Sequence, residues 1–336
     1  MVFRGHMISK KFIIALMACV IGLMFGVLIF DNVYQCLPSE SERFRHILNA
    51  CNASQEMKPD TVFFGSSVIM SGIDANIVNS KLSINSWNLG SPEQSCAEAM
   101  IISNNLPSSV RNVYVCYTPD ELANIKFIQI IYPNLNSIIM YGYKFSRNII
   151  NVFNKINPLL AEEIRKPKIA HLIKGRFVLK HAGSVLMRNL LRKDLNLKSA
   201  ARDLYFPLAG HRLSGRKGRQ ELIEGYLSKQ SDRECYKLNK GNRNLLFELA
   251  KILRETDVHL NLLILPENPD VRINNRDKFN QQFNSEIDLL RGRGLLNEIY
   301  DYHKLLGAEY FLDYSHLTKE GSMILTKKIV ADLEKE

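Results

Sequence analysis

The stretch DTVFFGSSVIMSG, residues 60–72, joins a short apolar run to a pair of serines. The run 60–65 predicts a buried strand that ends at a glycine, and the residues after it predict a helix. A serine at such a strand-to-helix turn exposes its hydroxyl above the sheet, where it can act as a nucleophile. The same position suits a helix N-cap, and either Ser66 or Ser67 could serve as that cap.

The same pattern of strand and helix continues on both sides of a long middle segment. Further apolar runs, each expected to form a strand, are 84–90, 111–118, 259–269 and 308–313. Helical spacing lies at 93–106, 242–256 and 318–334. Short strands that alternate with helices predict a three-layer α/β/α fold with a parallel sheet of the flavodoxin-like kind. In such sheets ligands bind at the carboxyl ends of the strands. Residues expected there are Ser66, Ser67, Gly90, 118–120, Glu267, Asn268 and Asp313.

The segment 123–241 interrupts this alternation and carries the excess positive charge. Between residues 161 and 220 there are 15 Lys and Arg against 4 Asp and Glu, in a chain whose net charge is +10. The segment is helical in pattern, and we interpret it as a basic helical insertion over the sheet. A basic surface of this kind suits nucleic acid, an anionic membrane surface or an acidic polymer.

The N-terminal region indicates which of these partners are suitable. Residues 1–11 are basic, and 12–30 form an uncharged run of 19 residues. A helix of that length rises about 28 Å, close to the hydrocarbon thickness of a bilayer. We therefore expect a signal anchor at 12–30, a polar connector at 31–58 and an α/β domain at 59–336 outside the cytoplasm. A buried core helix is the alternative. An extracytoplasmic domain makes nucleic acid an unsuitable partner.

A second candidate motif, FLDYSHLTKEGS, lies at residues 311–322. Asp313 and His316 are three residues apart in it, so both side chains can face one cleft. The carboxylate would then hold the imidazole in one tautomer and stabilise the imidazolium formed during proton transfer. An Asp that only caps the following helix is the alternative.

In order and spacing, these motifs resemble the SGNH/GDSL hydrolase superfamily. Gly65-Ser66-Ser67 takes the place of the family's Gly-Asp-Ser, and Asn88-Leu89-Gly90 resembles its second block. The resemblance implies that Ser67 is the nucleophile, that the Ser67 and Gly90 N–H groups bind the oxyanion, and that Asp313 and His316 are the acid and the general base. It covers about 60–122 and 258–334, and 123–241 has no counterpart in it.

The family's third block, Gly-x-Asn-Asp, is altered in this chain. Residues 117–122 read YTPDEL, without the asparagine that donates to the oxyanion hole in the family. Asp120 can stand for the block's final acid, and Asn268 is the candidate replacement donor. Asp120, Glu267 and Asn268 are also candidate substrate contacts.

The combination of a Gly-Ser-Ser block and a membrane anchor resembles the superfamily's extracytoplasmic members. These include the D-alanine transfer protein of teichoic acid modification and the acetyltransferases of exported polysaccharides. The resemblance implies a serine esterase or O-acyltransferase of the bacterial inner or cytoplasmic membrane, acting on an envelope glycan or an acyl carrier. A membrane acyltransferase is an expected partner. No cofactor is expected, and no metal, since the cysteines fit no metal-binding spacing.

The missing asparagine also supports an alternative from another class. A catalytically degenerate SGNH fold could bind or assemble an envelope polysaccharide complex, with residues such as Arg165, Lys166 and Lys168 as the contact surface.

Overall fold

The computed structural model describes residues 14, 16–18, 21–22, 42–53, 58–119, 121, 132–167, 203–206, 218–228, 240–271 and 277–335. Within them lies a five-stranded sheet with the order β2-β1-β3-β4-β5, in which every neighbouring pair is parallel. The strands are β1 (Thr61–Gly65), β2 (Ser86–Asn88), β3 (Asn112–Tyr117), β4 (His259–Ile264) and β5 (Ile299–Asp301). The parallel α/β sheet predicted from the sequence is confirmed. Its strand order reverses between β1 and β3, the place where doubly wound sheets bind their ligands.

Helices cover both faces of this sheet because its central strands alternate apolar side chains between two clusters. Val62 and Phe64 of β1 join one cluster, while Phe63 joins the other. The first cluster includes side chains of α5 (Cys96–Ser103) and α14 (Lys240–Glu255), and the second includes α3 (Ser67–Gly72), α4 (Ala75–Leu82) and α16 (Lys319–Leu333). Both faces are therefore buried, as parallel sheets require.

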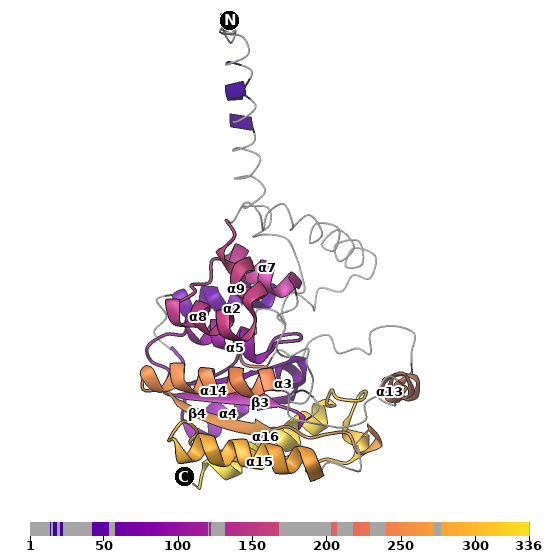
Figure 1. The fold of residues 1–336 in the computed structure, drawn as a ribbon. Coiled ribbons are helices and arrows are strands. Elements are labelled where there is room, and N and C mark those ends of the chain that lie inside the picture. The colour runs from indigo at the N-terminus through magenta and orange to yellow at the C-terminus, as the bar shows by residue number, and fades with distance from the viewer. Residues whose placement is uncertain are drawn as a thin grey trace, which may run out of the picture.

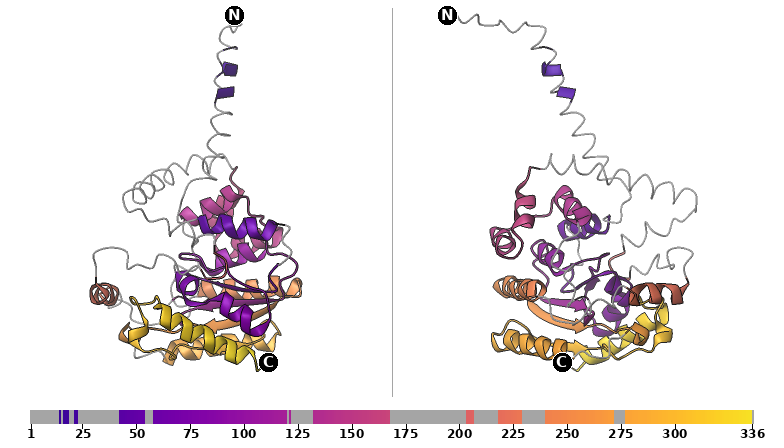
Figure 2. Two further views of the ribbon diagram at one scale, coloured as in Figure 1. Left: turned by 180° about the vertical axis from the view of Figure 1, so that it is seen from behind. Right: turned by 45° about the vertical axis from the view of Figure 1, so that its right-hand side comes forward.

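A further group of helices packs outside α5, on the side of the first cluster (Figure 1). They are α2 (Glu42–Asn52), α7 (Tyr132–Tyr141), α8 (Arg147–Ile156) and α9 (Pro158–Arg165). Helices α7, α8, α9 and α13 (Arg219–Leu227) are the described helices that lie wholly within the segment 123–241. Helix α13 lies apart from α7–α9, near the C-terminal part of the chain, in all three views (Figure 2).

The fifth strand differs from the one expected at 308–313. Residues 308–310 form the short 3₁₀ helix η3 (Ala308–Tyr310), and Phe311 makes only an isolated bridge with Leu317. The edge position is taken by β5, whose residues are half-buried or exposed. An edge strand this short and this exposed lacks the apolar run by which strands are recognised in a sequence.

The predicted membrane span 12–30 lies largely outside the described residues. Those described within it are helical, and Ile14, Leu16, Met17 and Ile21 are each at least 50% exposed. In the part of the chain that the structure describes, no helix is both long and apolar enough to cross a membrane.

A buried carboxyl group links α5 to α7 and gives the fold a pH dependence. Glu98 is fully buried, and it accepts hydrogen bonds from the backbone N–H of Ser95 and from the Asn134 side chain, at 2.9 Å for the latter. Burial raises the pKa of Glu98 to about 7, although the bonds from Ser95 and Asn134 oppose the shift.

We expect the free energy of unfolding to fall as the pH rises from about 4.5 to about 7. The folded state holds the Glu98 proton more tightly than the unfolded chain, so ionisation costs folded-state stability over that window, up to about 3 kcal/mol. Urea unfolding at several pH values measures this, and Glu98→Gln should flatten the profile. An unchanged pH profile in that variant would contradict the assignment.

Candidate active site

The serine pair stands at the carboxyl end of β1, and its two members have different roles. Ser66 is the N-cap of α3, and its buried hydroxyl accepts a hydrogen bond from the Val68 N–H at 3.2 Å. Ser67 is thus the first helical residue, and it is only partly buried. Its N–H belongs to the first turn, whose N–H groups have no acceptor within the helix.

Gly65 lets the backbone before the serines pass close to the neighbouring strand. A Cβ at this position would overlap the carbonyl oxygen of Cys116 on β3 and would lie 2.8 Å from the Ile69 Cγ2. The first of these is a backbone atom that cannot rotate away. Only glycine fits here, because any side chain would push β1 away from β3.

Replacing Gly65 by alanine should therefore reduce stability. We expect the free energy of unfolding to fall by about 2 kcal/mol, since β1 and β3 must separate to admit the methyl group. Gly72→Ala is the matched control in the same segment, because a Cβ on Gly72 would lie 3.8 and 3.9 Å from the nearest atoms, both of them side-chain carbons. Equal urea midpoints for the two variants would contradict this explanation.

Asp313 and His316 lie in a closed loop between η3 and α16. The Leu312 N–H donates to the His316 carbonyl at 2.7 Å and closes the loop. Within it, one Asp313 carboxylate oxygen accepts the backbone N–H groups of Ser315 and His316, each at 2.8 Å. The other oxygen lies 2.8 Å from the His316 Nδ1. One carboxylate therefore fixes both the loop backbone and the imidazole ring.

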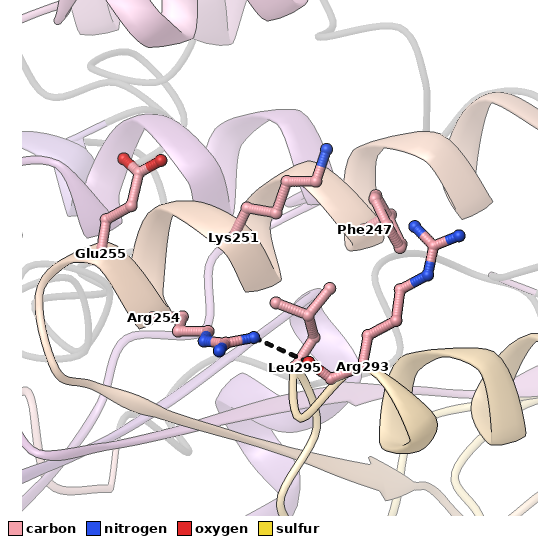
Figure 3. Close-up of a pocket in the computed structure, with 6 residues that line it drawn as sticks. All are labelled: Phe247, Lys251, Arg254, Glu255, Arg293 and Leu295. Atoms are coloured by element: carbon pink, nitrogen blue, oxygen red, sulfur yellow. Dashed lines mark hydrogen bonds between the residues drawn. The ribbon is translucent and has the colours of Figure 1, made fainter.

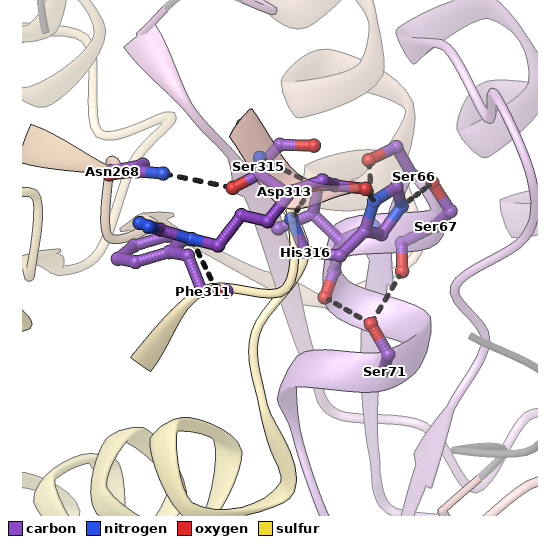
Figure 4. A network of polar contacts seen from close by, with 10 residues as sticks. Ser66, Ser67, Ser71, Asn268, Phe311, Asp313, Ser315 and His316 are labelled. Carbon is purple, nitrogen blue, oxygen red and sulfur yellow. Dashed lines mark hydrogen bonds and ion pairs between the residues drawn. The ribbon is translucent and has the colours of Figure 1, made fainter. Parts of the chain in front are cut away.

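The loop brings His316 to the serine turn, 249 residues away in the chain. The Ser67 Oγ and the His316 Nε2 are 2.8 Å apart (Figure 4). The His316 and Asp313 side chains are 17% and 15% exposed, so the three residues stand at an accessible surface. A proton on Nδ1 satisfies Asp313 and leaves Nε2 to accept the Ser67 O–H.

The carboxylate of this group is stabilised in its ionised form. Burial raises the pKa of Asp313, but the hydrogen bonds and charge of His316 outweigh this effect, and the pKa lies below its usual range. Asp313 is therefore ionised at neutral pH, as a carboxylate must be to stabilise an imidazolium.

The two groups assigned to the oxyanion hole besides Ser67 are engaged elsewhere. The Gly90 N–H donates to the side-chain oxygen of Asn88 at 3.0 Å, so an oxyanion would have to displace that bond. A Cβ on Gly90 would lie 2.8 Å from the Met70 nitrogen, which shows that this loop packs directly on α3.

Asn268 supports the loop that carries Asp313 and His316. It is fully buried, and its amide donates to the Asp313 carbonyl at 2.9 Å (Figure 4). Its side-chain oxygen accepts the Asp270 N–H at 3.0 Å. These contacts favour a role in holding Asp313 over the predicted role of oxyanion donor.

The other predicted contacts are placed as follows. Glu267 is 6% exposed, beyond the carboxyl end of β4, and its N–H donates to the His303 carbonyl at 3.2 Å. Asp120 lies outside the described residues. His303 follows β5, and its Nδ1 lies 2.6 Å from an Asp301 carboxylate oxygen. Among the described residues, no group of three His, Cys, Asp or Glu side chains could hold a metal ion.

Two buried residues that no sequence pattern indicates hold the loops after β1 and β2. The buried Gln94 accepts the Gly65 N–H at 2.8 Å and donates to the Leu89 carbonyl at 2.9 Å, so it ties the first loop to the second. Arg43 on α2 donates to the Gly90 carbonyl at 2.7 Å and also to the carbonyls of Asn88 and Asp203. Burial lowers the pKa of Arg43 to about 10.

No protein-family model matches the chain, and no curated protein matches it in sequence. Among solved structures, the chain is similar to one described as "a putative platelet activating factor from Streptococcus pneumonia". That match has a TM-score of 0.41 and 11% sequence identity, and it covers 94% of this chain and 99% of the other. A similarity at this level establishes neither a shared fold nor a shared activity.

Proposed function

We propose that the chain is a membrane-anchored serine esterase or O-acyltransferase of the SGNH type, acting on an envelope glycan or an acyl carrier. The observation that carries the proposal is the pair of 2.8 Å contacts that link Ser67 to His316 and His316 to Asp313. The Gly-Ser-Ser and Asn-Leu-Gly blocks, in their order before the terminal Asp-x-x-His, support the same reading. Anchoring through 12–30 rests on the length and apolar character of that run.

In the first half-reaction, Ser67 takes the acyl group from its donor. The Ser67 Oγ adds to the ester carbonyl carbon while the His316 Nε2 accepts the hydroxyl proton, and Asp313 stabilises the imidazolium. The Ser67 N–H donates to the oxyanion. The tetrahedral intermediate then expels the alcohol, which takes the proton from Nε2 and leaves an acyl ester on Ser67.

In the second half-reaction, an acceptor hydroxyl takes the acyl group. Water or a sugar hydroxyl gives its proton to Nε2 and attacks the acyl carbon, and collapse of the intermediate returns the proton to Ser67. Hydrolysis and transfer differ only in this acceptor. The two catalytic side chains on the 313–316 loop serve both steps.

The chemistry is tested by covalent labelling of the full chain in detergent. A fluorophosphonate should form one adduct, which peptide mass spectrometry should place on Ser67, and the labelled protein should no longer hydrolyse 4-nitrophenyl acetate. An adduct on another serine, or none, would count against the proposal.

A second candidate function is supported by a basic pocket at the other end of the sheet. The pocket has a volume of about 430 Å³ and is lined by Phe247, Lys251, Arg254, Glu255, Arg293 and Leu295 (Figure 3). The Lys251 Nζ lies 4.5 Å and the Arg293 guanidinium carbon 5.0 Å from the centre of the Phe247 ring. Since β4 begins just after α14, this pocket lies at the amino ends of the strands, away from Ser67.

Three cations against one carboxylate in the lining favour an anionic polymer, and the pocket would suit a binding subunit without catalytic activity. In complementation of a deletion strain, this alternative requires that Ser67→Ala restores function and that Lys251→Glu with Arg293→Glu does not. The enzyme proposal requires that Ser67→Ala fails.

A further inference from the structure

Helix α13 contacts the catalytic loop although it comes from the long basic segment. In the sequence it lies about ninety residues before Phe311, within 123–241, where the resemblance to known hydrolases has no counterpart. In the structure it packs against η2 (Pro269–Val271) and lies beside the C-terminal part of the chain (Figures 1 and 2).

The N-terminal residue of this helix, Arg219, makes three polar contacts on the loop and its support. Its guanidinium donates to the Phe311 carbonyl at 3.2 Å and to the Ala308 carbonyl at 2.9 Å. It also donates to an Asp270 carboxylate oxygen at 2.8 Å. A planar guanidinium can make these bonds at once, because its donors point in fixed, different directions.

Two chains of contacts connect Arg219 to Asp313. Phe311 pairs with Leu317 at the base of the loop that contains Asp313 and His316. Asp270 donates its N–H to the side chain of Asn268, which in turn donates to the Asp313 carbonyl. Arg219 thus contacts the base of the loop directly, and it is linked through Asp270 to Asn268, which braces the loop.

The other end of α13 contacts the loop directly. The Tyr226 ring stacks on that of Tyr314, with centroids 4.3 Å apart and planes 9° apart. Tyr314 lies between Asp313 and His316 in the sequence. Arg219 and Tyr226 are seven residues apart, or two helical turns, so one face of α13 carries both contacts.

We propose that Arg219 is a positioning residue for the acyl transfer, holding the loop so that the His316 Nε2 stays within hydrogen-bond reach of the Ser67 Oγ. This inference rests on the proposed function of that site. It also gives part of the basic segment a place in the active site, since α13 supplies a contact that neither the sheet nor α16 provides.

The expected result of Arg219→Gln is a fall in kcat by about 10- to 100-fold with little change in KM, because a small displacement of a catalytic group has an effect of that size. Hydrolysis of 4-nitrophenyl acetate by the full chain in detergent gives both constants, and the rate of fluorophosphonate labelling should fall in parallel. Arg219→Lys, which keeps the charge but not the planar fork, should recover part of the loss. Arg291→Gln is the control, since Arg291 is an exposed residue whose ion pair with Glu298 is 3.7 Å long.

A second variant separates positioning from folding. Tyr226→Ala removes the stacking contact and should also lower kcat, while thermal melting reports whether either variant unfolds. A kcat within twofold of wild type in Arg219→Gln would overturn the inference, as would a lower melting temperature with unchanged kcat for the folded protein. If Ser67→Ala keeps wild-type turnover, the proposed function itself fails. If Ser67→Ala is inactive and Arg219→Gln is not impaired, only the role of Arg219 fails.

Discussion

Ser67→Ala should abolish turnover and labelling while leaving the protein folded. The Ser67 Oγ forms the hydrogen bond with His316, and alanine keeps the first position of α3. Where a catalytic serine has been removed from other enzymes, kcat has fallen by about 10⁶-fold. We expect a loss of at least about 10⁴-fold for 4-nitrophenyl acetate and no fluorophosphonate adduct.

Two other serines provide the controls for this result. Ser66→Ala removes the N-cap of α3 and should lower the free energy of unfolding by about 1 kcal/mol, but the variant protein should still be labelled at Ser67. Ser80 lies on α4, where its hydroxyl donates to the Ile77 carbonyl at 3.0 Å, and Ser80→Ala should behave as wild type. Equal labelling of wild type and Ser67→Ala would refute the assignment of the nucleophile.

The parts of this site that could be predicted from the sequence depend on local chemistry. The run before Gly65 is apolar because β1 is buried on both faces, and the serines follow it directly. Asp313 and His316 meet because they are three residues apart in one closed loop. In both cases the pattern lies within one short stretch of the chain, so the order and spacing of its residues carry the information.

The supports of the site could not be predicted in this way. Gln94 reaches Gly65 from 29 residues away, and Arg43 reaches Gly90 from 47 residues away. Neither contact has a spacing pattern, since each depends on how separate elements pack. From the sequence alone, Arg43 would be predicted to lie in solvent, because it belongs to a short polar helix. Its burial is explained only by the loop carbonyls that it contacts.

The same limit applies to β5 and to the contacts that α13 makes. Ile299–Asp301 becomes a strand only because β4 offers it a free edge, which is a property of the sheet and not of these three residues. Arg219 belongs to a stretch whose charge indicates an exposed surface. Its contact with the Phe311 carbonyl appears only when chain segments 92 residues apart are placed together.

Replacing Asp313 by asparagine should also lower kcat strongly, because it changes the contact with His316. In the wild type, one carboxylate oxygen accepts two backbone N–H groups, and the other faces the His316 Nδ1. An asparagine that kept the backbone bonds would turn its NH₂ group toward Nδ1. The imidazole would then have to accept at Nδ1 and carry its proton on Nε2, where it could no longer take the proton of Ser67.

Asp313→Asn should therefore lower kcat by about 10⁴-fold at neutral pH while changing the melting temperature little. Asp301→Asn is the matched control, because Asp301 forms a similar 2.6 Å pair with His303 at the same edge of the sheet. That variant should keep its activity, since His303 has no contact with Ser67 among those described. A kcat for Asp313→Asn within tenfold of wild type would mean that the carboxylate only closes the loop, and that His316 holds its tautomer without it.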